Sequence, residues 1–84
     1  MSDVNQLIKE LKDIIADTGT PILGRATQIT DDLSQQYADL VDANPTFSQI
    51  NDMAGKIKAS GATEGENGVM WGEVIRLVHT LADS

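Results

Sequence analysis

The sequence predicts an all-α fold, either a small four-helix bundle or a pair of antiparallel helical hairpins. Apolar residues recur at spacings of three and four along most of the chain, which places them on one face of a helix. Gly and Pro interrupt this pattern at intervals of helical length, and no stretch alternates as a strand does. With 84 residues, 40% of them hydrophobic, the chain is long enough for one domain spanning 1–84.

The first helix is predicted roughly over residues 3–18. Ser2 or Asp3 can cap its free N–H groups. Gly19 and Pro21 predict where it stops, glycine as a left-handed C-cap and proline because it cannot continue the hydrogen-bond ladder. Its apolar face consists of Val4, Leu7, Ile8, Leu11, Ile14 and Ile15.

A second helix is predicted roughly over residues 21–43, with Thr20 as its N-cap and Pro21 at the first helical position. Its apolar residues keep helical phase until Asn44-Pro45 forces the chain out of the helix. They are Ile22, Ala26, Ile29, Leu33, Tyr37 and Leu40.

The remaining chain predicts two more helices. One covers roughly residues 45–60, begins with the same cap-plus-proline pair and ends at Gly61 as its C-cap. A glycine-rich loop is expected over 61–68, and the last helix roughly over 67–82. Short connections favour antiparallel neighbours. Apolar stripes that pack between copies of the chain would look the same, so a homo-oligomer remains an alternative.

The composition is strongly acidic. Thirteen Asp and Glu against six Lys and Arg give a net charge of −7, which repels nucleic acid and anionic membranes. No cysteine is present, so disulfides, thiolate nucleophiles and Cys-based zinc sites are excluded. The N-terminus lacks the basic start and apolar core of a signal peptide. We therefore expect a cytoplasmic protein, with leaderless secretion as an alternative.

The polar side of the second helix carries an acidic strip. No Lys or Arg occurs from Ala26 to Gly55. At about 100° per residue, one side of the helix collects Gln28, Asp31, Asp32, Gln35, Asp39 and Asp42. Such a strip is either a solvated face or a docking surface for a partner with a basic surface.

The sequence contains no recognisable motif for catalysis, phosphate binding or metal binding. The one histidine, His79, follows Glu73 and Arg76 at steps of three, which indicates an ion pair on the last helix rather than a nucleophile with its base. No phosphate-binding glycine loop occurs. Asp31 and Asp32 point about 100° apart, and no Asp-rich calcium loop surrounds them. We expect no enzyme, no cofactor and no metal site.

The only tryptophan, Trp71, follows Met70 and lies between Gly68 and Gly72. A lone aromatic residue on a helical stripe is typical of a core position. Trp and Met are also enriched where interfaces concentrate their energy, so Trp71 could instead be an exposed anchor.

Together these features predict a non-catalytic protein that binds another protein as an adaptor, inhibitor or immunity-type binder. The candidate contact residues are Asp31, Asp32, Asp39, Asp42, Met70 and Trp71. One alternative is a structural subunit of a helical homo-oligomer or secreted filament. The length and the mid-chain Asn44-Pro45 are similar to type III secretion needle subunits, whereas the glycine-rich loop, acidic balance and polar C-terminus differ from them. A second alternative is a DNA mimic that inhibits a nucleic-acid-binding protein.

Overall fold

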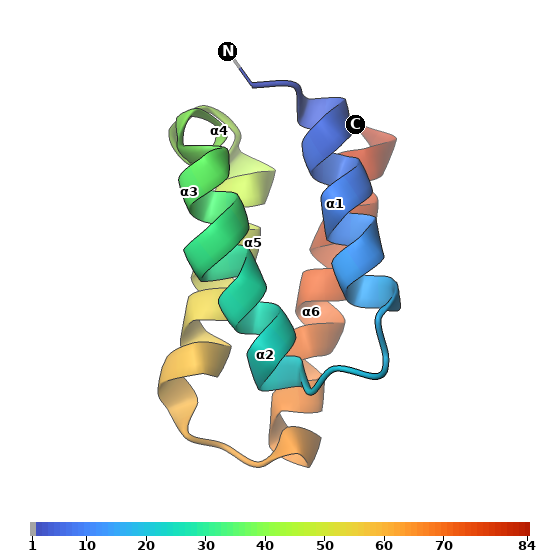
Figure 1. The fold of residues 1–84 in the computed structure, drawn as a ribbon, viewed down its shortest axis with the longest axis vertical. Coiled ribbons are helices and arrows are strands. Elements are labelled where there is room, and N and C mark those ends of the chain that lie inside the picture. The colour runs from blue at the N-terminus through green and yellow to red at the C-terminus, as the bar shows by residue number, and fades with distance from the viewer. Residues whose placement is uncertain (1) are drawn as a thin grey trace.

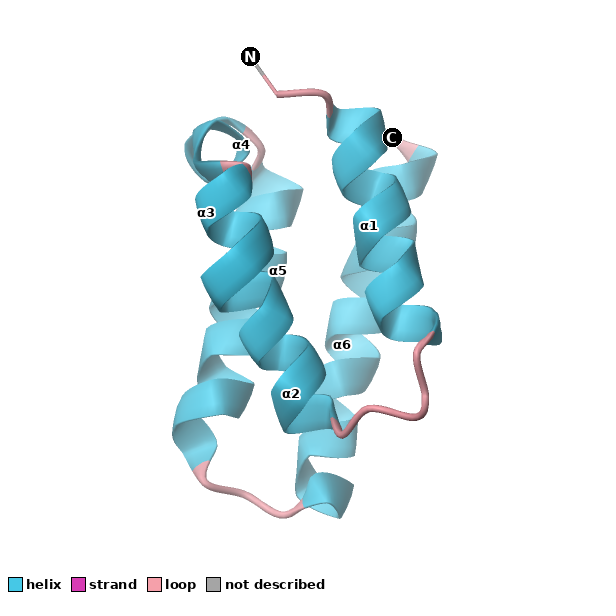
Figure 2. Cartoon of the chain, viewed as in Figure 1, coloured by secondary structure: helices cyan, strands magenta, loops and turns pink. Residues whose placement is uncertain are grey.

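Helices dominate the computed structural model, which describes residues 2–84. Within that range no strand occurs, and the all-α prediction is confirmed. The chain reverses direction after α1, after α4 and after α5 (Figure 1), and the loops between these stretches are short (Figure 2). The elements are α1 (Val4–Ala16), α2 (Ile22–Thr27), the π-helical segment η1 (Gln28–Leu33), α3 (Ser34–Gln36), α4 (Ala38–Ala43), α5 (Pro45–Ser60) and α6 (Glu64–Asp83).

The core lies between the long helices. α5 packs against α6, α2, α4 and η1, whereas α1 packs mainly against α6. The apolar stripes predicted from the spacing supply the buried side chains, and full burial of each large one contributes roughly 1.5–3 kcal/mol. The largest fully buried side chains are Phe47, Leu7, Leu11, Ile29, Ile50, Ile57, Leu81, Val74 and Val78.

Three predicted helix ends are confirmed. The side chain of Asp3 accepts a hydrogen bond from the Asn5 amide, and the side chain of Asn44 accepts one from the Phe47 amide. Gly61 ends α5 in the left-handed conformation, with φ of 64°. Each of these ends is set by residues within three positions, which is why local sequence predicts them.

The left-handed cap predicted at Gly19 is wrong. In the described residues only Gly61 has a positive φ. α1 ends instead at Asp17, whose side chain accepts a hydrogen bond from the Thr20 hydroxyl at 2.7 Å. This side-chain contact closes the turn, so no residue in it needs the left-handed region.

The start of α2 also differs from the prediction. Pro21 occupies the N-cap position, and the Thr20 side chain makes no cap. The Ile22 amide donates to Glu64 Oε1 at 2.7 Å, so the carboxylate that caps α2 comes from the first turn of α6. A carboxylate at a helix N-terminus also favours the positive end of the helix dipole.

The second predicted helix is not continuous. Its middle is the π-helical segment η1, and Tyr37, with φ of −113° and ψ of 38°, separates α3 from α4. Thr27 and Thr30 hydroxyls donate to the carbonyls of Leu23 and Thr27, a bonding mode that bends helices. The wider π turn and the break rotate all later residues relative to an unbroken α-helix.

The last helix begins at Glu64 rather than near residue 67, so most of the predicted loop over 61–68 is helical. The Thr63 hydroxyl accepts from the Glu66 amide at 3.1 Å and donates to Glu66 Oε1 at 3.0 Å. This Thr-x-x-Glu arrangement resembles a capping box and outweighs the low helix propensity of Gly65.

Replacing Glu64 by Ala removes the acceptor for the Ile22 amide. We expect the free energy of unfolding to fall by roughly 0.5–2 kcal/mol, the range for losing a helix cap. Glu64→Gln keeps a side-chain carbonyl oxygen and should lose clearly less. Urea denaturation followed by circular dichroism measures both variants, and equal losses would contradict the capping role of the oxygen.

Candidate functional site

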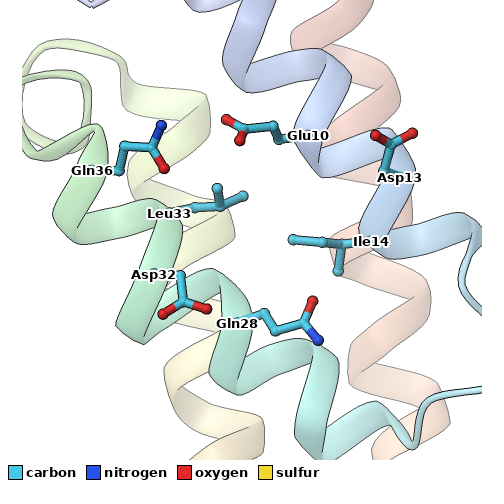
Figure 3. Close-up of a pocket in the computed structure, with 7 residues that line it drawn as sticks. All are labelled: Glu10, Asp13, Ile14, Gln28, Asp32, Leu33 and Gln36. Atoms are coloured by element: carbon cyan, nitrogen blue, oxygen red, sulfur yellow. The ribbon is translucent and has the colours of Figure 1, made fainter.

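A pocket of about 270 Å³ opens between α1 and the facing η1–α3 segment. We call it the α1–η1 groove. Figure 3 shows Ile14 from α1 and Leu33 from η1 pointing toward one another across its floor. Three carboxylates and two amides surround this apolar floor. The complete lining is Glu10, Asp13, Ile14, Gln28, Asp32, Leu33 and Gln36.

The groove carries negative charge that the chain does not neutralise. No Lys or Arg lines it. Within residues 2–84 the ion pairs are Lys58 with Asp31 and Arg76 with Glu73, and neither includes a lining residue. Asp13 and Asp32 are exposed and lie on opposite sides of the groove (Figure 3). The groove is therefore an acidic recess with carboxylates on both of its walls.

One lining carboxylate is held by Tyr37. The Tyr37 hydroxyl donates to Glu10 Oε2, while the ring is buried, with 4% of its surface exposed. The hydrogen bond to the Glu10 carboxylate, together with burial, raises the pKa of Tyr37 to about 12. The bond ties α1 to the break between α3 and α4, so it fixes one end of the groove.

The four aspartates predicted from the acidic strip do not share one face. Asp31 forms an ion pair with Lys58 Nζ of α5 at 2.7 Å, and this hydrogen bond lowers the pKa of Asp31. Asp39 accepts from the Ser2 amide at 2.7 Å and from its hydroxyl at 2.8 Å, which lowers the pKa of Asp39. Only Asp32 lines the groove.

The continuous strip is thus corrected. The π turn of η1 and the break at Tyr37 take α4 out of the line of α3. Figure 1 shows α4 end-on, as a ring, whereas α3 runs up the page. Asp42 is exposed on α4, beyond the break. A continuous strip requires an unbroken α-helix, and this stretch contains a π-helical segment and a break.

Trp71 lies in the core, with 4% of its surface exposed, and Met70 beside it is partly buried. The Arg25 guanidinium stacks over the indole at 5.0 Å from the ring centroid. Arg25 is itself buried and donates to the Ile15 carbonyl at the end of α1, at 3.5 Å. Of the two alternatives for Trp71, the structure shows the core position.

Sequence reasoning missed the α1 wall of the groove. Glu10 and Asp13 flank the apolar stripe of the first helix, as charged residues do on most amphipathic helices. Nothing local marks them, because their significance arises only when η1 packs opposite. The opposite wall was partly predicted, because its lining residues Gln28 and Asp32 belong to the predicted acidic strip.

A second surface lies on the outer side of α6. A Cβ added at Gly68 or Gly72 would meet nothing within 4 Å, so packing within the chain does not require glycine there. Val69 between them is 81% exposed. The predicted ion pair of Glu73 with Arg76 is present on the same helix, and it lowers the pKa of Glu73.

No group of three or more His, Asp or Glu side chains in residues 2–84 is arranged to hold a metal ion. None of the helices described there has the length and apolar character needed to cross a membrane.

Tyr37 is the only tyrosine, so tyrosinate absorbance reports its ionisation alone. We expect a native-state midpoint at about pH 12 rather than 10, because Glu10 stabilises the protonated phenol. The raised pKa stabilises the fold fully below about pH 10, and this contribution disappears as the pH rises through about 12. Glu10→Gln should move the midpoint toward 10.

Circular dichroism at the same pH values verifies that the chain is still folded during this titration. A midpoint near 10 in the folded wild-type chain would contradict the Tyr37–Glu10 hydrogen bond.

The site as a whole is an acidic recess beside the buried ring of Tyr37, with two of the four predicted aspartates engaged inside the chain. Comparison of the chain with protein-family models, with curated proteins and with solved structures found no match.

Proposed function

We propose that this chain is a non-catalytic binding module, of the adaptor, inhibitor or immunity type, for a protein partner with a basic surface. The observation that carries the proposal is the α1–η1 groove, where Glu10, Asp13 and Asp32 meet over an apolar floor without a neutralising Lys or Arg. Complementary charge speeds association and selects partners. The net charge of −7 adds long-range attraction for a cationic protein.

We propose the α1–η1 groove, rather than the predicted acidic strip, as the contact surface. Asp31 and Asp39 already have partners within the chain, so a basic protein would have to compete for them. Asp32 and Asp13 have no such competitor in the part of the chain described. Trp71 is buried in the core and is therefore not part of the proposed contact surface.

A protein partner fits these observations better than DNA mimicry. A phosphate mimic needs carboxylates in a row at regular spacing along the surface. The acidic residues of the groove instead lie on opposite walls of a recess that has Ile14 and Leu33 between these walls. A recess of this kind suits a side chain that enters it.

The double variant Asp13→Lys/Asp32→Lys should lose partner capture. We expect at least about a tenfold loss of affinity, because close charge pairs at interfaces couple by roughly 1.5 kcal/mol or more. Affinity purification from the source organism, quantified by mass spectrometry, compares the variant with the wild-type chain.

The matched control is Asp52→Lys/Asp83→Lys. Both positions are exposed and lie outside the groove, and the control changes the net charge by the same amount. An equal loss of partner capture in the control would show that the effect comes from the overall charge and not from the groove. Unchanged capture by the groove variant would overturn the proposed function.

A homo-oligomer is the second candidate, favoured by the open glycines and the exposed Val69 on α6. Glycine on a helix face lets another backbone approach closely, and nothing in the described chain uses this closeness.

Gly68→Ala/Gly72→Ala tests the two candidates together. If the chain acts as a monomeric binder, both substitutions fit the open space and should stabilise the helix by up to roughly 1 kcal/mol each. We expect this gain in urea denaturation, and a monomeric mass over a concentration series in sedimentation. A wild-type mass that rises with concentration, and falls back in the variant, would favour the oligomer instead.

A further inference from the structure

The α1–η1 groove has the size of a site for one side chain. Its volume is about 270 Å³, below the range of roughly 300–1,000 Å³ typical of small-molecule sites. It is open along one side, between α1 and η1, and its floor is apolar where Ile14 and Leu33 point toward one another. A long side chain that carries a polar head on an apolar stem matches this layout.

The polar groups of the groove are acceptors set apart from one another. Carboxylates come from Asp13 and Glu10 on one wall and from Asp32 on the other, and Gln28 and Gln36 add amide oxygens. These carboxylates do not gather closely enough to hold a metal ion in the described chain. An extended cation with several donors fits such a spacing better than a compact one.

Arginine is the side chain with these properties. Its planar guanidinium carries five N–H donors in a fixed fork, whereas the lysine ammonium is a compact point charge with three donors. Three aliphatic carbons of the arginine stem can cover Ile14 and Leu33 while the guanidinium reaches carboxylates on both walls. Glu10 is held in place by Tyr37, so one acceptor is already oriented before a ligand arrives.

We propose that the α1–η1 groove binds an arginine side chain presented by the protein partner. This inference rests on the proposed function and names the chemistry of its central contact. Lysine on the partner would steer the encounter, and arginine would fill the groove.

The test is an NMR titration of the full chain, labelled with ¹⁵N and ¹³C, with three small probes at low ionic strength. The probes are N-acetyl-arginine amide, N-acetyl-lysine amide and N-acetyl-citrulline amide, the last having the shape of arginine without its charge. We expect saturable shifts from the arginine probe at the side-chain amides of Gln28 and Gln36 and at the methyl groups of Ile14 and Leu33. The lysine probe should bind several-fold more weakly, and citrulline should leave these signals unchanged.

Asp13→Asn/Asp32→Asn should weaken binding of the arginine probe by about tenfold, while Asp52→Asn/Asp83→Asn should leave it unchanged. Equal shifts from all three probes, or shifts spread over the surface without saturation, would overturn the proposal. Equal affinity for lysine and arginine would overturn it as well, because it would reduce the contact to charge alone.

The two proposals fail separately. If the arginine probe does not bind but Asp13→Lys/Asp32→Lys still abolishes partner capture, the proposed binding function is supported and the proposed arginine contact is wrong. If the probe binds as expected but capture is unaffected, the groove recognises arginine and the proposed partner surface lies elsewhere.

Discussion

The hydrogen bond from Tyr37 to Glu10 is the contact on which the candidate site depends. α1 packs mainly against α6, and its contact with η1 is slight. The bond therefore joins α1 to the far side of the groove at the point where the facing helix breaks. The hydrogen bonds of Arg25 with Ile15 and of Ser2 with Asp39 tie the same parts of the chain outside the groove, and the Tyr37–Glu10 bond is the one that holds a lining carboxylate. Burial of the Tyr37 ring anchors the bond in the core.

Charge is distributed unevenly over this small acidic molecule. Lys58 and Ser2 each engage an aspartate of the predicted strip, and Arg76 engages Glu73. Arg25 is withdrawn from the surface altogether, over the ring of Trp71. Arg25, Lys58 and Arg76 therefore do not pair with the carboxylates of the α1–η1 groove, and no Lys or Arg lines it. The fields of exposed charges are screened over roughly 8 Å at physiological salt, so their effect on association is local.

The parts of the fold that could be predicted are those set by neighbouring residues. Asp3, Asn44 and Gly61 act within a turn of themselves, and the apolar stripes follow a fixed helical period. The Thr63–Glu66 capping pair was equally local, but the glycines beside it suggested a loop. The groove and the cap that Glu64 provides for Ile22 could not be predicted, because each depends on residues that meet only after folding. Asp32 was predicted as a contact residue because it belongs to the acidic side of its own helix. Asp13 was not, because its place in the groove depends on the packing of η1 opposite α1.

The cap that Glu64 provides for the Ile22 amide links two helix ends that are 42 residues apart in sequence. α2 continues directly into η1, so the Ile22 amide is one of the free N–H groups at the N-terminal end of the whole helical stretch. When the glycine-containing first turn of α6 frays, the Ile22 amide loses its acceptor in the same event. We therefore expect the start of α2 and the start of α6 to open to solvent together, as one cooperative unit in hydrogen exchange, rather than as two independent fraying ends.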